Sequence, residues 1–382
     1  MRVLHVFPEY LPLTMPWARQ QILQTPEVEA HIAGLTYLSD TGGTGVGVRW
    51  PNPRYAYPKP LQGLVHLGLR KFGGYDRALL RYLKAYSIDL LHCHFGNMGA
   101  DYIHLAVRAG IPGLVSFYGF DYRRILQERP VYRLRYERMF GAAAAILCEG
   151  PYAAGQLEHL GCPAHKIRIV PMGVDLSTIP FVVRQKQVGA LRLVQVAGIA
   201  PYKGQLQAVQ AFERALRTYP DMHLELYGPV RDERYARSVE AYIRQERLSD
   251  KVSLSGAIPY GQLPHVLEKS QVFLHPSMHA PSGDCEGGAP VVLLDAQANG
   301  MPVIATRHCD IPSEVAHGES GLLTEEGDVE ALSAAILAFA EMGDSEYKAF
   351  ALRARRKMES GFCIASCGKK VLDCYKEWLK KA

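Results

Sequence analysis

Short apolar runs alternate with stretches of helical periodicity along the whole chain. The runs are rich in Val, Ile and Leu, as is typical of parallel strands that are buried on both faces. Because strand and helix alternate in both halves, the pattern predicts an α/β protein with two doubly wound domains. We expect the strands at residues 2–7, 29–34, 88–92, 112–117, 143–148, 167–171, 191–197, 222–227, 251–254, 271–275, 302–306 and 321–323.

The alternating pattern breaks between residues 176 and 190, where Pro180 is followed by a polar stretch. A break of this kind marks a linker. After residue 363, three cysteines and Trp378 share one helical face, which we interpret as a packing stripe. We therefore divide the chain into an N-terminal Rossmann-like domain, a C-terminal Rossmann-like domain and a terminal helix that packs back towards the first domain, at residues 1–180, 188–362 and 363–382.

Composition narrows the class of protein. Of the 382 residues, 48% are hydrophobic and 21% are charged, as in ordinary soluble proteins. No apolar run reaches the roughly 18 residues of a membrane span, and residues 2–7 look like a strand, not a signal peptide, so we expect a cytoplasmic protein. The eight cysteines form no Cys-x-x-Cys pair, so we expect reduced thiols and no zinc motif.

The net charge of +5 is unevenly distributed. Residues 1–180 hold 19 Lys and Arg against 13 Asp and Glu, which indicates an anionic partner on that side. The charge is too small for duplex binding and no nucleic-acid motif is present, so we expect no nucleic-acid partner. The basic stretches 69–84 and 123–138 are either solvated helical faces or a surface that docks on anionic lipid at the inner face of the membrane.

A glycine-rich turn between two predicted strands carries the strongest functional signal. We expect it to open a helix near Gly287, whose unpaired N–H groups and positive dipole end suit a phosphate. Glu286 can accept hydrogen bonds from sugar hydroxyls, and Asp295, about two turns into the helix, from ribose hydroxyls. The alternative is an acidic turn that only stabilises a helix, by a few tenths to ~1 kcal/mol. The donor-binding candidates here are Gly287, Gly288, Ala289, Pro290 and Asp295.

The stretch from His275 to Leu323 resembles the donor-binding region of retaining GT-B glycosyltransferases of family 4, which includes many polysaccharide and lipopolysaccharide enzymes. That family carries two acids separated by seven residues, in Glu-Gly-x-Pro-x-x-x-x-Glu. In this chain Glu286 and Asp295 are separated by eight, and Asp replaces the second Glu. The resemblance implies the GT-B fold, with two doubly wound Rossmann-like domains facing across a cleft.

The segment from Val196 to Gly204 resembles the part of the family that binds the diphosphate. There an Arg precedes Lys-Gly by five residues. Lys203 is kept, whereas Gly198 stands at the position of the Arg. Arg231, which follows Gly228 in Tyr-Gly-Pro-Val-Arg, is a candidate for the missing cation. The alternative for Lys203 is a solvated lysine beside a helix start.

Two segments of the first half also resemble the family. Residues 92–96 match its His-x-His-Phe-Gly, and residues 116–121 match its Phe-His-Gly-x-Asp except that Tyr118 replaces the His near the reacting sugar carbon. A tyrosine pKa of about 10 excludes a general base near neutral pH. Tyr118 therefore either donates a hydrogen bond, or the main-chain carbonyl does the family's work. We expect the acceptor side to include Thr14, His94 and Asp121.

The resemblance implies transfer of a sugar from a nucleotide-diphosphate donor to a glycan or lipid-linked acceptor, with retention of configuration. The C-terminal domain holds the donor and the N-terminal domain the acceptor. We expect no cofactor and no metal, because Lys203 and a helix dipole can stabilise the leaving diphosphate. The catalytic candidates are Glu286, Lys203 and Tyr118. Two other functions stay open: a nucleotide-sugar epimerase or hydrolase of the same fold, and a non-catalytic nucleotide-sugar-binding subunit.

Overall fold

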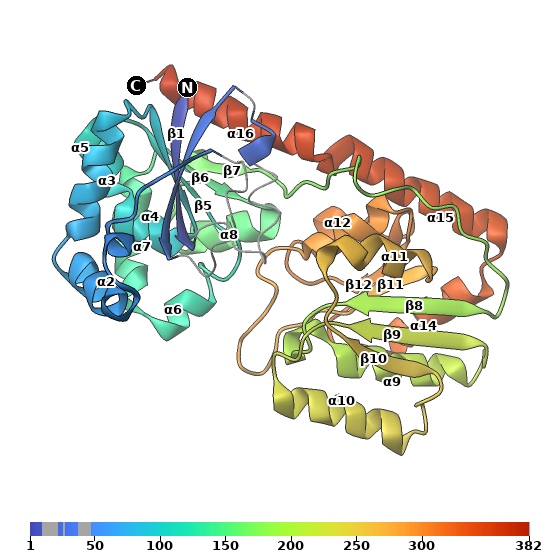
Figure 1. Ribbon diagram of the computed structural model, residues 1–382. Coiled ribbons are helices and arrows are strands. Elements are labelled where there is room, and N and C mark those ends of the chain that lie inside the picture. The colour runs from blue at the N-terminus through green and yellow to red at the C-terminus, as the bar shows by residue number, and fades with distance from the viewer. Residues whose placement is uncertain (10–21, 26, 37–46, 382) are drawn as a thin grey trace. The chain divides into compact units, whose positions relative to one another are not determined.

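The computed structural model describes residues 1–9, 22–25, 27–36 and 47–381. The chain divides into two compact units, one of residues 1–173 with 364–382 and one of residues 174–363. Each unit is built around one parallel sheet (Figure 1). The prediction of two doubly wound α/β domains is therefore confirmed.

The first unit has a seven-stranded sheet in the order β3-β2-β1-β4-β5-β6-β7. All of its strand pairs are parallel. The edge strand β3 was not expected, because two residues are too few to show a pattern. The strands are β1 (Arg2–Glu9), β2 (Glu29–Thr36), β3 (Val48–Arg49), β4 (Leu90–His94), β5 (Gly113–Ser116), β6 (Ala145–Cys148) and β7 (Ile167–Ile169).

Alternate residues of this sheet face two different layers. Leu4, Leu91 and Val115 pack in one cluster with residues of several helices on one face. Val3 and Leu114, on the other face, pack with residues of the C-terminal helix. The helices of this unit are η1 (Pro53–Ala56), η2 (Lys59–Leu61), α2 (Gln62–Lys71), α3 (Gly74–Ala85), α4 (Gly96–Tyr102), α5 (His104–Ala109), α6 (Arg124–Glu128), α7 (Val131–Ala142), α8 (Pro151–His159), η3 (Ala164–Lys166) and α16 (Ile364–Leu379).

The second unit has a six-stranded parallel sheet in the order β10-β9-β8-β11-β12-β13. Its strands are β8 (Leu191–Val196), β9 (Met222–Tyr227), β10 (Val252–Gly256), β11 (Val272–His275), β12 (Val303–Thr306) and β13 (Gly321–Thr324). Its helices are η4 (Pro201–Lys203), α9 (Gln205–Leu216), α10 (Glu233–Gln245), η5 (Tyr260–Gln262), α11 (Leu263–Glu268), α12 (Val291–Ala298), α13 (Ile311–Glu314), α14 (Val329–Glu341), α15 (Asp344–Lys357) and the π-helical turn η6 (Met358–Phe362).

Both faces of the second sheet are covered by helices. Residues of α9 and α14 pack with one set of strand residues, and residues of α11 and α12 with the alternate set (Figure 1). Burial on both faces explains why the strands are continuous apolar runs. None of the described helices is long and apolar enough to cross a bilayer.

The boundary between the units lies before the expected one, at Gly173 instead of residue 180. The stretch that follows packs on the second unit: the Val182 N–H donates to the Asn299 carbonyl (3.1 Å), and Arg184 donates to the Leu267 carbonyl (3.0 Å). Sequence alone shows this stretch only as a loss of periodicity, and the partners that hold it are distant in the chain.

Helix α16 completes the first unit from the far end of the chain. The Tyr375 hydroxyl makes a 2.6 Å hydrogen bond with His92 Nδ1, and Arg168 pairs with Glu377 at 3.2 Å. These contacts join β4 and β7 to the helix, so the first unit needs residues from both ends of the sequence.

Candidate active site

Four loops of the second unit carry the residues of the candidate site, and all but His308 hold a predicted site residue. Lys203 follows β8, Arg231 follows β9, Glu286 lies between β11 and α12, and His308 follows β12. Because these strands are parallel neighbours, their carboxyl ends lie at one edge of the sheet. Ligands of open α/β sheets bind at this edge.

The Glu286 carboxylate is the centre of the site. Its Oε2 accepts from Lys203 Nζ at 2.5 Å, and its Oε1 accepts from Ser277 Oγ at 2.5 Å and from His275 Nε2 at 3.1 Å. Its backbone N–H donates to His308 Nε2 at 3.1 Å. The side chain is only 6% exposed, so it is held by protein groups and not by water.

The charge of Glu286 is set by these partners. Burial raises the pKa of the carboxyl, but the Lys203 ammonium and the His275 hydrogen bond outweigh burial and hold this pKa well below its ordinary value. Burial lowers the pKa of His275, although its bond with Glu286 opposes that effect. These partners therefore keep Glu286 ionised, and burial favours the neutral form of His275.

Lys203 is placed by a turn that only glycine fits well. Gly204 has φ of +68°, and a Cβ there would lie 2.0 Å from the Pro276 carbonyl oxygen. Glycine permits both the left-handed conformation and this close approach. Gln195 Nε2 also donates to the Lys203 carbonyl at 2.8 Å. The turn thus carries Lys203 onto the loop that contains Glu286.

The helix after the glycine-rich turn begins later than expected. Gly287, Gly288 and Ala289 lie outside it, and α12 begins at Val291 after Pro290. Pro290 has an extended ψ of 121° and no N–H, so the residues before it do not join the helical hydrogen bonds. The expectation that the helix begins near Gly287 is wrong, because α12 begins one turn further along.

Asp295 lies on the second turn of α12, where its side chain is buried. The Tyr260 hydroxyl donates to its Oδ1 at 3.1 Å. Burial raises the pKa of Asp295 to about 7, and the Tyr260 hydrogen bond only partly opposes this. The residue is therefore close to half protonated near neutral pH, unlike Glu286.

Arg231 lies across Gly198. A Cβ on Gly198 would stand 2.8 Å from Arg231 Cγ. The loop after β9, which starts at Gly228, is paired with the loop after β8, because the Arg231 N–H donates to the Ile199 carbonyl at 3.1 Å. The space beside residue 198 is therefore occupied by a guanidinium side chain from the neighbouring loop.

In the first unit, Tyr118, His94 and Asp121 lie together. The Tyr118 hydroxyl makes a 2.7 Å hydrogen bond with His94 Nδ1, and Asp121 accepts from the Tyr118 N–H at 3.0 Å. Burial raises the pKa of Tyr118 well above its ordinary value. His94 and Asp121 are buried and both hold Tyr118, and their expected place on the acceptor side stays a prediction. Thr14 lies outside the described residues.

Two family patterns cover most of the chain. Residues 181–357 match the family described as glycosyl transferases group 1, and residues 39–178 match glycosyltransferase family 4. The amylovoran biosynthesis glycosyltransferase AmsK of Erwinia amylovora is 30% identical over 73% of this chain and 68% of its own. “Putative colanic acid biosynthesis glycosyltransferase WcaL” of Escherichia coli (strain K12) is 30% identical over 78% of this chain and 74% of its own. The chain belongs to glycosyltransferase family 4.

Solved structures agree on the fold of this family 4 glycosyltransferase. Anabaena Alr3699/HepE in complex with UDP has a TM-score of 0.74 at 14% identity and covers 99% of this chain and 100% of its own. Sucrose-phosphate synthase from Thermosynechococcus elongatus has a TM-score of 0.74 at 16% identity, over 100% of both chains. The predicted GT-B fold is confirmed.

Sequence reasoning missed the partners of Glu286 in this glycosyltransferase. The sequence showed His275 only as the end of a predicted strand, and Ser277 and His308 only as part of the stretch from His275 to Leu323 that resembles the family. The usable signal was their position, because His275 ends β11 and the other two follow β11 or β12 at the carboxyl edge of the sheet. Glu326, which holds His308 Nδ1 at 2.7 Å, carried no such signal.

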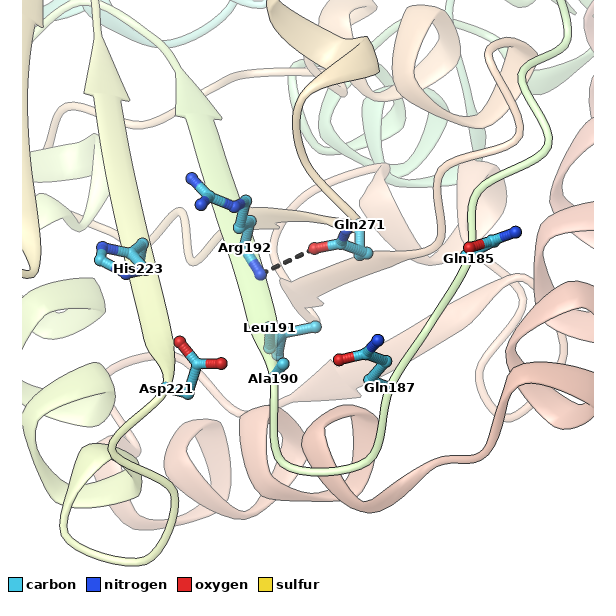
Figure 2. Close-up of a pocket in the computed structure, with 8 residues that line it drawn as sticks. All are labelled: Gln185, Gln187, Ala190, Leu191, Arg192, Asp221, His223 and Gln271. Carbon is cyan, nitrogen blue, oxygen red and sulfur yellow. Dashed lines mark hydrogen bonds between the residues drawn. The ribbon is translucent and has the colours of Figure 1, made fainter.

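A polar pocket lies at the opposite edge of the same sheet (Figure 2). There the Arg192 N–H donates to Gln271 Oε1 at 2.8 Å. The pocket is formed by residues at the amino ends of β8, β9 and β11, so it is on the wrong edge for the donor of a glycosyltransferase. Its lining residues are Gln185, Gln187, Ala190, Leu191, Arg192, Asp221, His223 and Gln271.

The raised pKa of Asp295 predicts a pH dependence of stability. Its folded state keeps a proton up to a pH of about 7, whereas the unfolded state releases it near 3.8, so the contribution of Asp295 to stability should fall as the pH rises through this window. In Asp295→Asn this loss should disappear, and the difference in unfolding free energy should grow by at most about 1.4 kcal/mol per pH unit. Urea unfolding at several pH values measures it, with the surface variant Asp250→Asn as control. Parallel curves for wild type and Asp295→Asn would contradict the assignment.

Proposed function

We propose that this chain transfers a sugar from a nucleotide-diphosphate donor to a glycan or lipid-linked acceptor, with retention of configuration, in polysaccharide assembly. The observation that carries the proposal is the buried pair of Lys203 and Glu286 at the carboxyl edge of the second sheet. Support comes from relatives named for colanic acid and amylovoran biosynthesis, and from structural neighbours in complex with UDP and UDP-glucose.

The second unit binds the donor. When the bond between the sugar carbon and the phosphate oxygen breaks, negative charge develops on the diphosphate, and cations placed there lower the barrier. An ammonium has three donors, so Lys203 can keep Glu286 while it binds a phosphate oxygen. Arg231 supplies the second cation. With two cations at the diphosphate, the reaction needs no metal there.

Glu286 orients the sugar. Its carboxylate stays ionised, so it can accept hydrogen bonds from hydroxyls and stabilise positive charge on the ring. The departing phosphate oxygen takes the acceptor proton as the acceptor oxygen bonds to the sugar carbon on the same face. Asp295, with its higher pKa, is the candidate partner for the ribose hydroxyls. Tyr118 provides a hydrogen bond on the acceptor side and not a base.

The first unit binds the acceptor and contacts the membrane. In the basic stretch 69–84, Tyr75 and Tyr82 are buried in the core, so they do not form part of a docking face. The preceding helix α2 instead exposes apolar side chains, with Leu64 72% and Leu67 62% exposed. Lys71 ends the same helix. Exposed leucines beside a cation fit an anionic bilayer better than water.

The pair of Lys203 and Glu286 can be tested by single and double substitution. Lys203→Met or Glu286→Gln should reduce sugar transfer by about 10²–10³-fold, because each removes a charge from the reacting centre. Each single variant should also lose up to about 3–5 kcal/mol of stability, since one buried charge is left unpaired, and the double variant should recover stability but not activity.

The measurement is acceptor-dependent release of nucleotide, with urea unfolding of the same variants. Nucleotide released with free sugar or an isomer in the absence of acceptor would indicate a hydrolase or epimerase. Donor binding without turnover would indicate a binding subunit. Wild-type turnover in both single variants would remove the pair from the active site.

Arg231 and Gly198 provide a second test. Arg231→Ala should slow transfer by about 10–100-fold through loss of one diphosphate cation. The double variant Gly198→Arg/Arg231→Ala should recover part of the rate, whereas Gly198→Arg alone should not, because its side chain would meet Arg231. Steady-state kinetics with varied donor measures the effect, and Arg237→Ala on the surface of α10 is the control. Full activity of Arg231→Ala would contradict the role.

Membrane contact can be tested by cosedimentation with vesicles. Leu64→Ser/Leu67→Ser should bind anionic vesicles several-fold less than wild type, because apolar insertion is lost while the core is untouched. Leu352→Ser, an exposed leucine in the second unit, should bind like wild type. Equal, weak binding of wild type to anionic and neutral vesicles would refute the docking surface.

A further inference from the structure

Two thiols meet beside the loop that carries Glu286. Cys285 lies directly before Glu286, and Cys309 lies in the loop after β12. A ring nitrogen of His279 and the two sulfur atoms all lie within 4.8 Å of one another. The Cys309 thiol also hydrogen-bonds with that of Cys285. Imidazole nitrogen and cysteine sulfur are the ligand types that Zn²⁺ prefers, and here one nitrogen and two sulfur atoms lie close together.

Glu326 fixes the tautomer of the histidine. Its carboxylate accepts from His279 Nδ1 at 2.9 Å and from His308 Nδ1 at 2.7 Å, and the His279 backbone N–H donates to it at 2.7 Å. A carboxylate only accepts, so Nδ1 of each ring carries the proton and the lone pair lies on Nε2. A carboxylate that holds the outer nitrogen of a histidine is the usual second layer around a bound metal ion.

The neighbouring His308 has a different task. Its Nε2 accepts from the Glu286 N–H at 3.1 Å and lies 3.3 Å from Cys309 Sγ. His308 therefore supports the Glu286 loop, and His279 is the candidate nitrogen ligand. Cys309 has a backbone φ of +47°, which residues other than glycine rarely adopt. Such backbone conformations occur at ligand-binding positions, where the surrounding structure maintains them.

We propose that His279, Cys285 and Cys309 bind a zinc-class divalent cation, with Glu326 orienting the histidine. Both thiols lose their protons to solvent as the metal–sulfur bonds form, and water takes the fourth position of the tetrahedron. No zinc motif is visible in the sequence, because the ligands are separated by 5 and 23 residues and lie on two loops. The site is distinct from the diphosphate, where we expect no metal.

The ion would connect the loop after β11, which contains Glu286, to the loop after β12, which contacts the Glu286 backbone. Cys285 is covalently adjacent to Glu286, and Cys309 is adjacent to His308, which holds the Glu286 backbone. Bound metal would therefore fix the position of the carboxylate. This consequence rests on the proposed function, whereas metal binding itself does not.

The test is the metal content of the full chain, purified without a histidine tag under reducing conditions and then incubated with Zn²⁺ and dialysed. Elemental analysis should find about one zinc per chain in wild type and in the control Cys363→Ser. Cys285→Ser and Cys309→Ser should each lose it, and Glu326→Gln should bind about 10–100-fold more weakly. Substitution with Co²⁺ should give thiolate charge-transfer absorption that both serine variants lack.

Two results would overturn the site. One is zinc content in Cys285→Ser and Cys309→Ser equal to that of wild type. The other is absence of zinc from the reduced wild-type protein. This result would overturn the site whether or not mass spectra of the oxidised protein show a Cys285–Cys309 disulfide. Circular dichroism of each variant shows whether it is folded, and His279→Gln provides a further variant that keeps both thiols. The metal readout does not depend on sugar transfer, so its failure is distinguishable from failure of the proposed function.

Discussion

Glu286 is a buried carboxylate, and a buried charge is costly unless it is paired and hydrogen-bonded. The rest of the second unit supplies that pairing: Lys203 from the loop after β8, and His275 and Ser277 from the end of β11. These groups reach one point only because β8 and β11 are parallel neighbours in the centre of the sheet. The site therefore depends on the order of the strands. That order brings Lys203 to Glu286, and the pairing offsets the cost of burying the carboxylate.

Glu286 and Asp295 are both buried carboxyl groups, one in the loop before α12 and one in α12 itself, but their pKa values shift in opposite directions. Glu286 has a cation at 2.5 Å and stays ionised, whereas Asp295 has a neutral hydroxyl as partner and a pKa raised to about 7. Environment, not residue type, separates a permanent anion that can orient a sugar from a group that can exchange a proton. A nucleotide-sugar donor has hydroxyls on its sugar and on its ribose, and a site for it can use one carboxyl group of each kind.

The strands and the two α/β domains could be predicted from the sequence, because strands that are buried on both faces appear in it as apolar runs. The sequence also predicted Glu286 and Lys203 as site residues, from their place after strands and from the family resemblance, and in the structure the two are paired. It failed where placement depends on distant residues, as in the linker held by Asn299 and the partners of Glu286. The start of α12 was misplaced for a local reason, because the effect of Pro290 was not taken into account. Periodicity records which face of an element is buried, but not which remote side chain meets it.

Gly198 and Arg231 show what such a failure means for function. A position-by-position comparison finds a lost arginine at 198, and from that alone the chain could be a binding subunit. In the structure the arginine side chain from the next loop fills that space, and an added side chain at 198 would collide with it. A diphosphate responds to where positive charge lies, not to which residue number carries it. The glycine leaves room for Arg231, so its presence at residue 198 is compatible with the proposed transferase site.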